Sequence, residues 1–170
     1  SLEDIKNSPV VASPLRLFDC SISVNGAASL IISKDTTDVE IIGSAEETDY
    51  LSTFEREDML YWDATTMAAE NAFREAKISP DDIDIAELHD AFTPVEMISY
   101  EDLGFCKKGE GRSLVRKEIT SINGKLPVNT SGGLKAKGHP ISATGISQVY
   151  ELVKQMRNQA GDRQVDNIKY

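Results

Sequence analysis

The sequence predicts an α/β domain in which helices cover a mostly parallel sheet. From Asp38 onward, short apolar stretches typical of strands alternate with longer stretches in which apolar residues recur at three- and four-residue spacing. The chain has 170 residues, which suits one domain or one domain plus a remnant of another. Its 40% hydrophobic content is enough for a core, so a layered fold is expected.

The strands are predicted where apolar residues run together beside turn signals. Residues 27–32 and 38–44 are the first of these stretches. Residues 83–90, "IDIAELHD", and the short stretch 126–130, "LPVNT", come later. Residues 165–170, "VDNIKY", have the pattern of an approach to a further strand.

The helices are predicted from apolar periodicity and from start signals. Asp63 is expected to cap a helix whose small residues share one face, which predicts close packing and burial. Thr93 is expected to cap the next helix, with Pro94 at its first position and Glu96 closing a capping box. The last helix is expected to begin at or just after Pro140. Its predicted apolar side consists of Ile146, Val149, Tyr150, Val153 and Met156.

Composition excludes several classes of partner. A net charge of −10 would repel nucleic acids and anionic membranes over most of the surface. No apolar run approaches the roughly 20 residues that a membrane-spanning helix needs. Cys20 and Cys106 match no metal or redox spacing, so a reducing, cytoplasmic location is expected.

The two histidines occupy equivalent positions in the predicted fold. His89 lies at the C-terminal end of a predicted strand, and His139 directly precedes the last predicted helix. Ligands of open α/β sheets bind in the crevice beyond the carboxyl ends of the strands. We therefore expect both imidazoles to face one pocket, and it is the pair, rather than either residue alone, that favours a functional site.

The loop before the last helix is rich in glycine. Gly132, Gly133 and Gly138 permit positive φ angles and a close approach of the backbone to a ligand. Free N–H groups beside a helix start suit developing negative charge. Such loops also occur simply to turn the chain. A metal site with His89, Asp90 and His139 as ligands is a further alternative, although no third strong ligand has helical or CxxC spacing.

The stretches "LPVNTSGGLKAKGHPISATGISQVYEL" and "ELHDAFTPVEMISYEDLGF" closely resemble the C-terminal half of thiolases. The likeness is to the archaeal and sterol-carrier-protein type of acetyl-CoA acetyltransferase, which carries HDAF or HDCF where other members carry NEAF. The stretch "LRLFDCSISVNGAASLIIS" resembles the end of the thiolase N-terminal half. The resemblance implies that residues 1–36 are a remnant of that half and residues 37–170 a truncated C-terminal domain. It also implies a mixed, mostly parallel sheet with helices on both faces and its last strands missing.

The resemblance implies acyl transfer to and from coenzyme A, by Claisen condensation or by thiolysis of a 3-ketoacyl-CoA. His139 matches the histidine that activates a nucleophilic cysteine, and His89 matches the one that helps form the oxyanion site. The loop residues expected to support the substrate and the oxyanion are Asn129, Ser131, Gly132, Gly133 and Gly138. No metal and no cofactor beyond the CoA thioester substrate is expected.

The same resemblance implies partners for the chain. The family's nucleophilic cysteine lies in the N-terminal half, and neither Cys20 nor Cys106 matches it, so the 170-residue chain is expected to be inactive alone. The expected partners are acetyl-CoA or another acyl-CoA, the missing N-terminal half, identical chains in an oligomer, and a hydroxymethylglutaryl-CoA synthase complex. A non-catalytic thiolase-like scaffold or acyl-CoA-binding subunit is the alternative.

Overall fold

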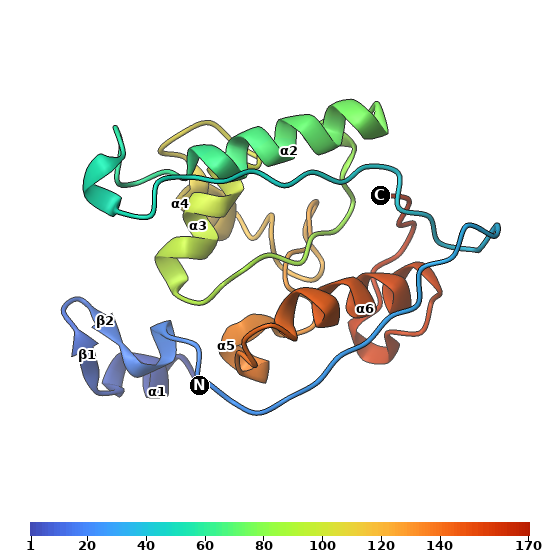
Figure 1. Ribbon diagram of the computed structural model, residues 1–170. Helices are drawn as coiled ribbons and strands as arrows, with labels where there is room; N and C mark the ends of the chain where they lie inside the picture. The colour runs from blue at the N-terminus through green and yellow to red at the C-terminus, as the bar shows by residue number, and fades with distance from the viewer.

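The computed structural model describes residues 1–170, and its helices lie in two groups with an extended segment running past both (Figure 1). One group contains α2, α3 and α4, and the other contains α5 and α6 (Figure 1). A small N-terminal unit contains α1 and a hairpin. The elements are α1 (Leu2–Asn7), β1 (Val10–Ala12), β2 (Leu15–Arg16), α2 (Asp63–Ala76), α3 (Thr93–Asp102), α4 (Gly111–Arg116), α5 (Gly133–Lys137) and α6 (Thr144–Met156), with short 3-10 turns between them.

The regular sheet is smaller than predicted. It consists of β1 and β2, which pair antiparallel with Val10 opposite Arg16. Parallel pairing occurs as isolated bridges, one between Ala86 and Val128 and one between Ser23 and His139. The mostly parallel sheet is therefore not confirmed, although the Ala86–Val128 bridge keeps its parallel sense where residues 83–90 meet residues 126–130.

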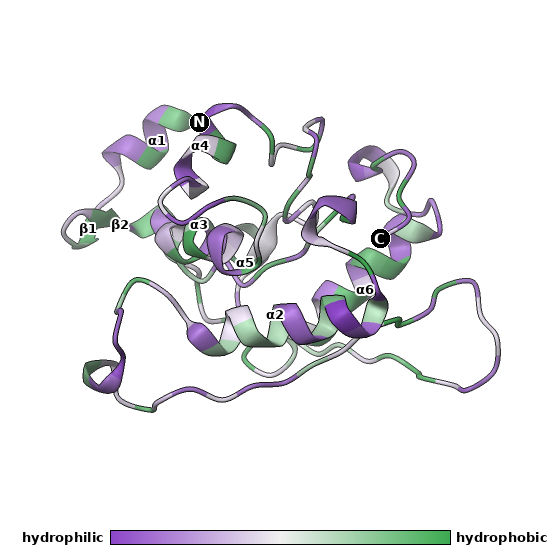
Figure 2. Cartoon of the chain, turned by 90° about the horizontal axis from the view of Figure 1, so that it is seen from above, coloured by the Kyte–Doolittle hydropathy of each residue, from purple (hydrophilic) through white to green (hydrophobic).

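Residues 27–32 and 38–44 are extended but are not paired strands, which corrects the prediction for both. A strand is stabilised by the backbone of a neighbour, and residues 24–51 make no backbone–backbone hydrogen bond. Hydrophobic stretches, green in Figure 2, lie along this segment, and Ile31 is 98% exposed. The segment is attached by side chains instead, including a 2.7 Å ion pair between Asp38 and Arg157.

The hydrophobic core lies where residues 83–90 and 126–130 meet α3 and α4. It contains Ala86, Leu88, Tyr100, Leu126 and Val128, all of them buried. The core is small, and the chain exposes 11520 Å² in total. A folded monomer of 18.7 kDa is expected to expose about 8,300 Å². The chain therefore presents considerably more surface than a self-sufficient domain of its mass.

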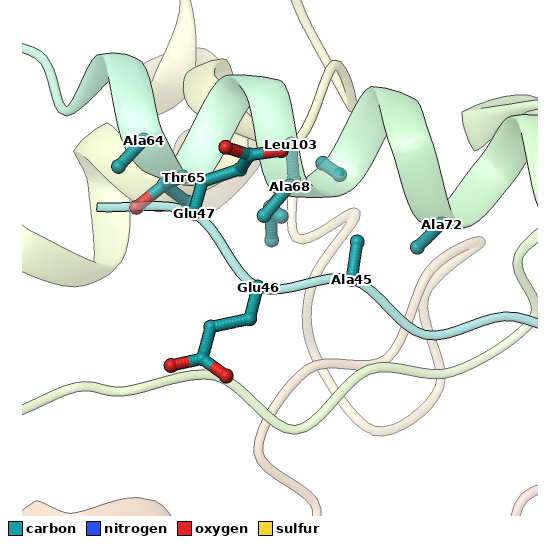
Figure 3. A pocket seen from close by; sticks show the side chains of 9 residues that line it. Ala45, Glu46, Glu47, Ala64, Thr65, Ala68, Ala72 and Leu103 are labelled. Atoms are coloured by element: carbon teal, nitrogen blue, oxygen red, sulfur yellow. The ribbon is translucent and has the colours of Figure 1, made fainter. Parts of the chain in front are cut away.

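Helix α2 forms where predicted but is not buried. Trp62 rather than Asp63 is its N-cap, and none of its residues is buried. Its alanine-rich face is covered in part by the extended segment, where Gly43 approaches so closely that an added Cβ would lie 2.4 Å from the Ala72 carbonyl oxygen. An open groove of about 460 Å³ remains between residues 45–47 and this face (Figure 3).

Helices α3 and α6 also form, with different starts from those predicted. Phe92 is the N-cap of α3, and no capping box closes there. The Thr93 hydroxyl donates to Asp19, and Glu96 accepts from the Tyr100 hydroxyl at 2.7 Å. Helix α6 begins at Thr144, after a turn in which the Pro140 carbonyl accepts from the backbone N–H groups of residues 143 and 144.

The buried side of α6 is polar, contrary to the expectation from its apolar periodicity. The buried residues are Thr144, Glu151 and Gln155. On the predicted apolar side, Val149 and Tyr150 are exposed. The polar side packs inward because its side chains bind backbone groups and charges: Gln155 donates to the Arg163 carbonyl at 2.7 Å, and Glu151 pairs with the Arg163 guanidinium at 3.0 Å.

Candidate active site

The two histidines, 50 residues apart in the sequence, lie side by side in the structure. The centroids of the His89 and His139 rings are 4.9 Å apart, and the ring planes meet edge to face at 83°. His89 is exposed and His139 is half-buried. The convergence expected from their matching positions is thus present in the structure.

His89 follows a segment that the loop at residues 129–135 holds in place. Ser131 donates its backbone N–H and its hydroxyl to Glu87, at 2.9 and 2.6 Å. The Leu88 N–H donates to the Asn129 side-chain oxygen at 2.7 Å. The side chains of residues 87, 90 and 129 therefore link residues 87–90 to the loop at 129–135, in place of the backbone hydrogen bonds of a sheet. The His89 side chain itself makes no hydrogen bond.

Asp90 forms the most buried of these links. Its side chain is 1% exposed, and its Oδ1 atom accepts from the Leu134 N–H at 2.7 Å. Its Oδ2 atom lies 3.4 Å from the backbone nitrogen of Lys135. Asp90 thus satisfies backbone donors of the short helix α5, which leads directly to His139. Gly133 has φ +63, and a Cβ there would lie 2.3 Å from the Asp90 carboxylate, so only glycine fits.

His139 is held by a different part of the chain. Its backbone N–H donates to the Ile22 carbonyl at 2.8 Å, beside the bridge with Ser23. Gly138 has φ +85, and a Cβ there would lie 2.7 Å from the side chain of Val24. The N-terminal segment therefore fixes the backbone of His139, and the glycine is required by both its dihedral angle and its neighbour.

The structure places the remaining predicted loop residues in the framework that joins residues 87–90 to α5. Asn129 adopts φ +54, and its side-chain oxygen is engaged by Leu88. The Ser131 hydroxyl donates to Glu87 and accepts from the Gly133 N–H at 3.3 Å. Gly132 is the N-cap of α5. Their role in oxyanion support stays a prediction, because these contacts fix the loop and leave the role itself untested.

Sequence reasoning missed Gln148 and Thr144, and it considered Asp90 only as a metal ligand, not as an acceptor for the backbone of α5. Gln148 donates from α6 to the Leu88 carbonyl at 2.7 Å, next to His89. The Thr144 hydroxyl lies 2.7 Å from Nδ1 of His139. A signal was available for the α6 residues, because 144, 148, 151 and 155 recur at four- and three-residue spacing on one face. No signal indicated the role of Asp90 in holding α5, because its partners lie 44 and 45 residues further along the chain.

The surroundings favour neutral imidazole at His89. Although His89 is exposed by surface area, the protein atoms around its ring displace water and lower its pKa. The neighbouring His139 lowers the pKa further, and the Asp90 carboxylate opposes both effects. Burial raises the pKa of Glu87, while its hydrogen bonds from Ser131 act in the opposite direction. A neutral imidazole can accept a proton at one nitrogen and donate a hydrogen bond from the other.

Neither cysteine has the surroundings of an activated nucleophile. Burial and the carboxylates of Glu101 and Glu110 raise the pKa of the Cys106 thiol to about 11. The Cys20 thiol donates to the Arg16 carbonyl at 3.5 Å. No group of three or more His, Cys, Asp and Glu side chains is arranged to hold a metal ion. None of the helices combines the length and apolarity needed to cross a membrane.

Comparison with known proteins identifies relatives over nearly the whole chain. The acetyl-CoA acetyltransferase of Methanothermobacter thermautotrophicus is 46% identical over 99% of this chain. Sterol carrier protein 2 of Rattus norvegicus is 38% identical over 99% of it. A solved structure of an Ltp2-ChsH2(DUF35) aldolase superimposes with a TM-score of 0.76 over 95% of this chain at 25% identity. The chain spans 46% of the first relative, 33% of the second and 46% of the solved chain.

The family comparison covers most of the same region. Residues 45–170 match the family described as "Thiolase C-terminal domain-like". This range contains both imidazoles and the loop that positions them. The match covers well over half of the chain, and the archaeal and sterol-carrier-protein relatives are those that the HDAF and GHP motifs indicated. The chain belongs to the thiolase family, within the part of it that forms the C-terminal domain.

Proposed function

We propose that the chain is the C-terminal catalytic half of a thiolase-type acyltransferase, which performs Claisen condensation or thiolysis on CoA thioesters. The observation that carries the proposal is the 4.9 Å separation of the His89 and His139 rings. Backbone and side-chain contacts from separate segments hold the two residues at this distance. His89 is the residue of its segment whose side chain is left free for a substrate.

The proposed chemistry divides between the two imidazoles. His139 takes the proton of a cysteine thiol, and the resulting thiolate attacks the acyl carbon of the thioester. The bond from that carbon to the CoA sulfur then breaks, and coenzyme A leaves as a thiol with the proton returned by His139. His89 donates a hydrogen bond to the thioester oxygen as negative charge develops on it, directly or through water. Its lowered pKa favours the neutral form near pH 7, in which one ring nitrogen still carries the proton needed for that bond.

The nucleophile in this proposal comes from an N-terminal half. Cys106 has a pKa near 11 and would be almost entirely protonated at neutral pH. The relatives are more than twice as long as this chain. The excess exposed surface, including Ile31 and the unpaired backbone of residues 24–51, is available to such a half. Acyl-CoA as substrate, assembly of identical chains and association with a hydroxymethylglutaryl-CoA synthase belong to the same proposal.

Thiolysis of acetoacetyl-CoA tests the proposal. The 170-residue chain alone should show no turnover, and the chain joined to the N-terminal half of the archaeal relative should show turnover. Replacing His89 by Ala in the joined protein should lower kcat by about 10²- to 10³-fold, the range found when one oxyanion donor is lost. His139→Ala should abolish turnover, and Gly145→Ala serves as control because nothing lies within 4 Å of that position.

Two results would overturn this assignment. One is thiolysis by the chain alone that disappears in Cys20→Ala, which would place the nucleophile within these residues. The other is a joined protein that turns over equally well without either imidazole.

A second candidate is a non-catalytic subunit that binds acyl-CoA or supports a partner. The similarity to an aldolase solved together with a DUF35 protein favours assembly with another chain. This candidate predicts acyl-CoA binding, measured by calorimetry, without turnover in the joined protein, and binding that survives His139→Ala. Turnover that depends on both imidazoles would exclude it.

A further inference from the structure

Thr144 is positioned to control the chemistry of His139. It is the first residue of α6, and it is 5% exposed. Its hydroxyl oxygen lies 2.7 Å from Nδ1 of His139 and 3.2 Å from the Pro140 carbonyl oxygen. These are the only hydrogen-bond contacts of the Thr144 hydroxyl, and the contact with Thr144 is the only one made by the His139 ring.

The hydroxyl has one proton and can satisfy these contacts in two ways. If it donates to Pro140, its oxygen accepts from a protonated Nδ1, and both contacts become hydrogen bonds. If it donates to Nδ1, no proton lies between the hydroxyl oxygen and the Pro140 carbonyl oxygen. These two acceptors, 3.2 Å apart, then form no hydrogen bond. The first arrangement uses a Thr hydroxyl bonded to the carbonyl four residues before it, a contact that Thr also makes within helices. It is favoured because a buried hydroxyl is stabilised by making both bonds.

We infer that Thr144 holds His139 as the tautomer protonated at Nδ1, which leaves the Nε2 lone pair free to receive a proton. The inference rests on the proposed function only for its catalytic meaning, in which Nε2 takes the thiol proton of the nucleophile. Thr144 is a positioning residue in this scheme, since it acts through the imidazole and needs no contact with the substrate. The tautomer itself is a property of the chain that exists with or without turnover.

Nitrogen NMR of histidine-labelled protein measures the tautomer directly. The chain has only two histidines, and His89→Gln assigns the remaining signals to His139. In spectra recorded over a pH series, the neutral form of His139 should show at Nε2 the shift of an unprotonated ring nitrogen and at Nδ1 that of a protonated one. The reverse pattern would overturn the inference, because it would show the hydroxyl donating to the ring.

Substitutions at residue 144 separate the tautomer from folding. Thr144→Ser retains the hydroxyl and should keep the wild-type nitrogen shifts. Thr144→Val keeps the shape but removes both hydrogen bonds, so the His139 signals should move toward a mixture of tautomers while the His89 signals stay in place. If the Thr144→Val variant fails to fold, the nitrogen shifts of the wild-type protein and of Thr144→Ser still determine the tautomer of His139.

Kinetics of the joined protein test the catalytic consequence. Thr144→Val should lower kcat by about 10- to 100-fold, the range found when the hydrogen-bond partner that orients a metal-binding histidine is removed. KM should stay unchanged, and Thr144→Ser should restore kcat. A kcat of Thr144→Val equal to that of the wild type would exclude a catalytic role for Thr144. A joined protein without thiolysis would defeat the proposed function alone, since the nitrogen shifts would still report the tautomer.

Discussion

Replacement of Asp90 by Ala should both destabilise the chain and separate the two imidazoles. The Asp90 carboxylate is 1% exposed and accepts from the Leu134 N–H at 2.7 Å. Its loss would leave that N–H buried without a partner, because water has no access to replace the oxygen. Helix α5 would lose its contact with the segment that carries His89. Gly138 and His139 follow α5 directly, so they would no longer be held beside that segment.

The expected loss of stability follows from the contacts. A hydrogen bond to a charged group contributes about 1.5–3 kcal/mol, and burial puts this one in the upper part of the range. The 3.4 Å contact with Lys135 adds little, because it lies at the limit of hydrogen-bond distance. We therefore expect a loss of about 2–3 kcal/mol in the free energy of unfolding, a factor of roughly 30–150 in the folding equilibrium.

Urea unfolding followed by circular dichroism measures this change, and Asp82→Ala is the matched control. Asp82 also accepts a backbone N–H at 2.7 Å, from Ser79, but it is exposed, so water can replace it and its loss should be clearly smaller. Asp90→Asn keeps one acceptor and should fall between wild type and Asp90→Ala. Equal losses for Asp90→Ala and Asp82→Ala, or unchanged cross-relaxation between the two imidazoles in Asp90→Ala, would refute the reasoning.

Further predictions concern the pair, its glycine and the thiol. NMR titration should give His89 a pKa below the usual value of about 6.5, and His139→Gln should raise it. As the pH falls, His89 is protonated at a higher pH in the unfolded chain than in the folded one. Its contribution should therefore lower the free energy of unfolding as the pH drops below about 6.5, and an increase in its contribution would contradict the prediction. Gly138→Ala should cost about 1–3 kcal/mol in urea unfolding because of its φ of +85 and the clash with Val24, whereas Gly145→Ala in the open turn of α6 should be neutral or stabilising. Alkylation of Cys106 at pH 8, followed by mass spectrometry, should be roughly 100-fold slower in the folded chain than in urea, and equal rates would contradict its raised pKa.

The sequence predicted helices better than strands because the two depend on different information. The spacing in α2, α3 and α6 is local, and each helix formed within a few residues of the predicted range. Residues 27–32 and 38–44 have strand composition, but a strand also needs a neighbouring backbone. No backbone forms hydrogen bonds with them in the structure, so both remain extended and unpaired.

The candidate site was predictable in outline only. The convergence of His89 and His139 followed from their matching positions before two helices, and the family resemblance pointed to the same residues. The supporting contacts were hidden because they join distant residues, such as Asp90 with Leu134 and Gln148 with Leu88. Side-chain to backbone bonds of this kind leave no periodic pattern in a single sequence.

The two sides of α6 show what this chain contributes to the proposed enzyme. Its polar side is buried, and Gln148 and Thr144 use it to fix Leu88 and His139. Its other side leaves Val149 and Tyr150 exposed. Hydrogen bonds are directional and set positions closely, whereas apolar contacts mainly contribute free energy through buried area. The geometry of the imidazole pair therefore belongs to this chain, and a partner that covers its apolar surface would add stability and a nucleophile without having to build the pair.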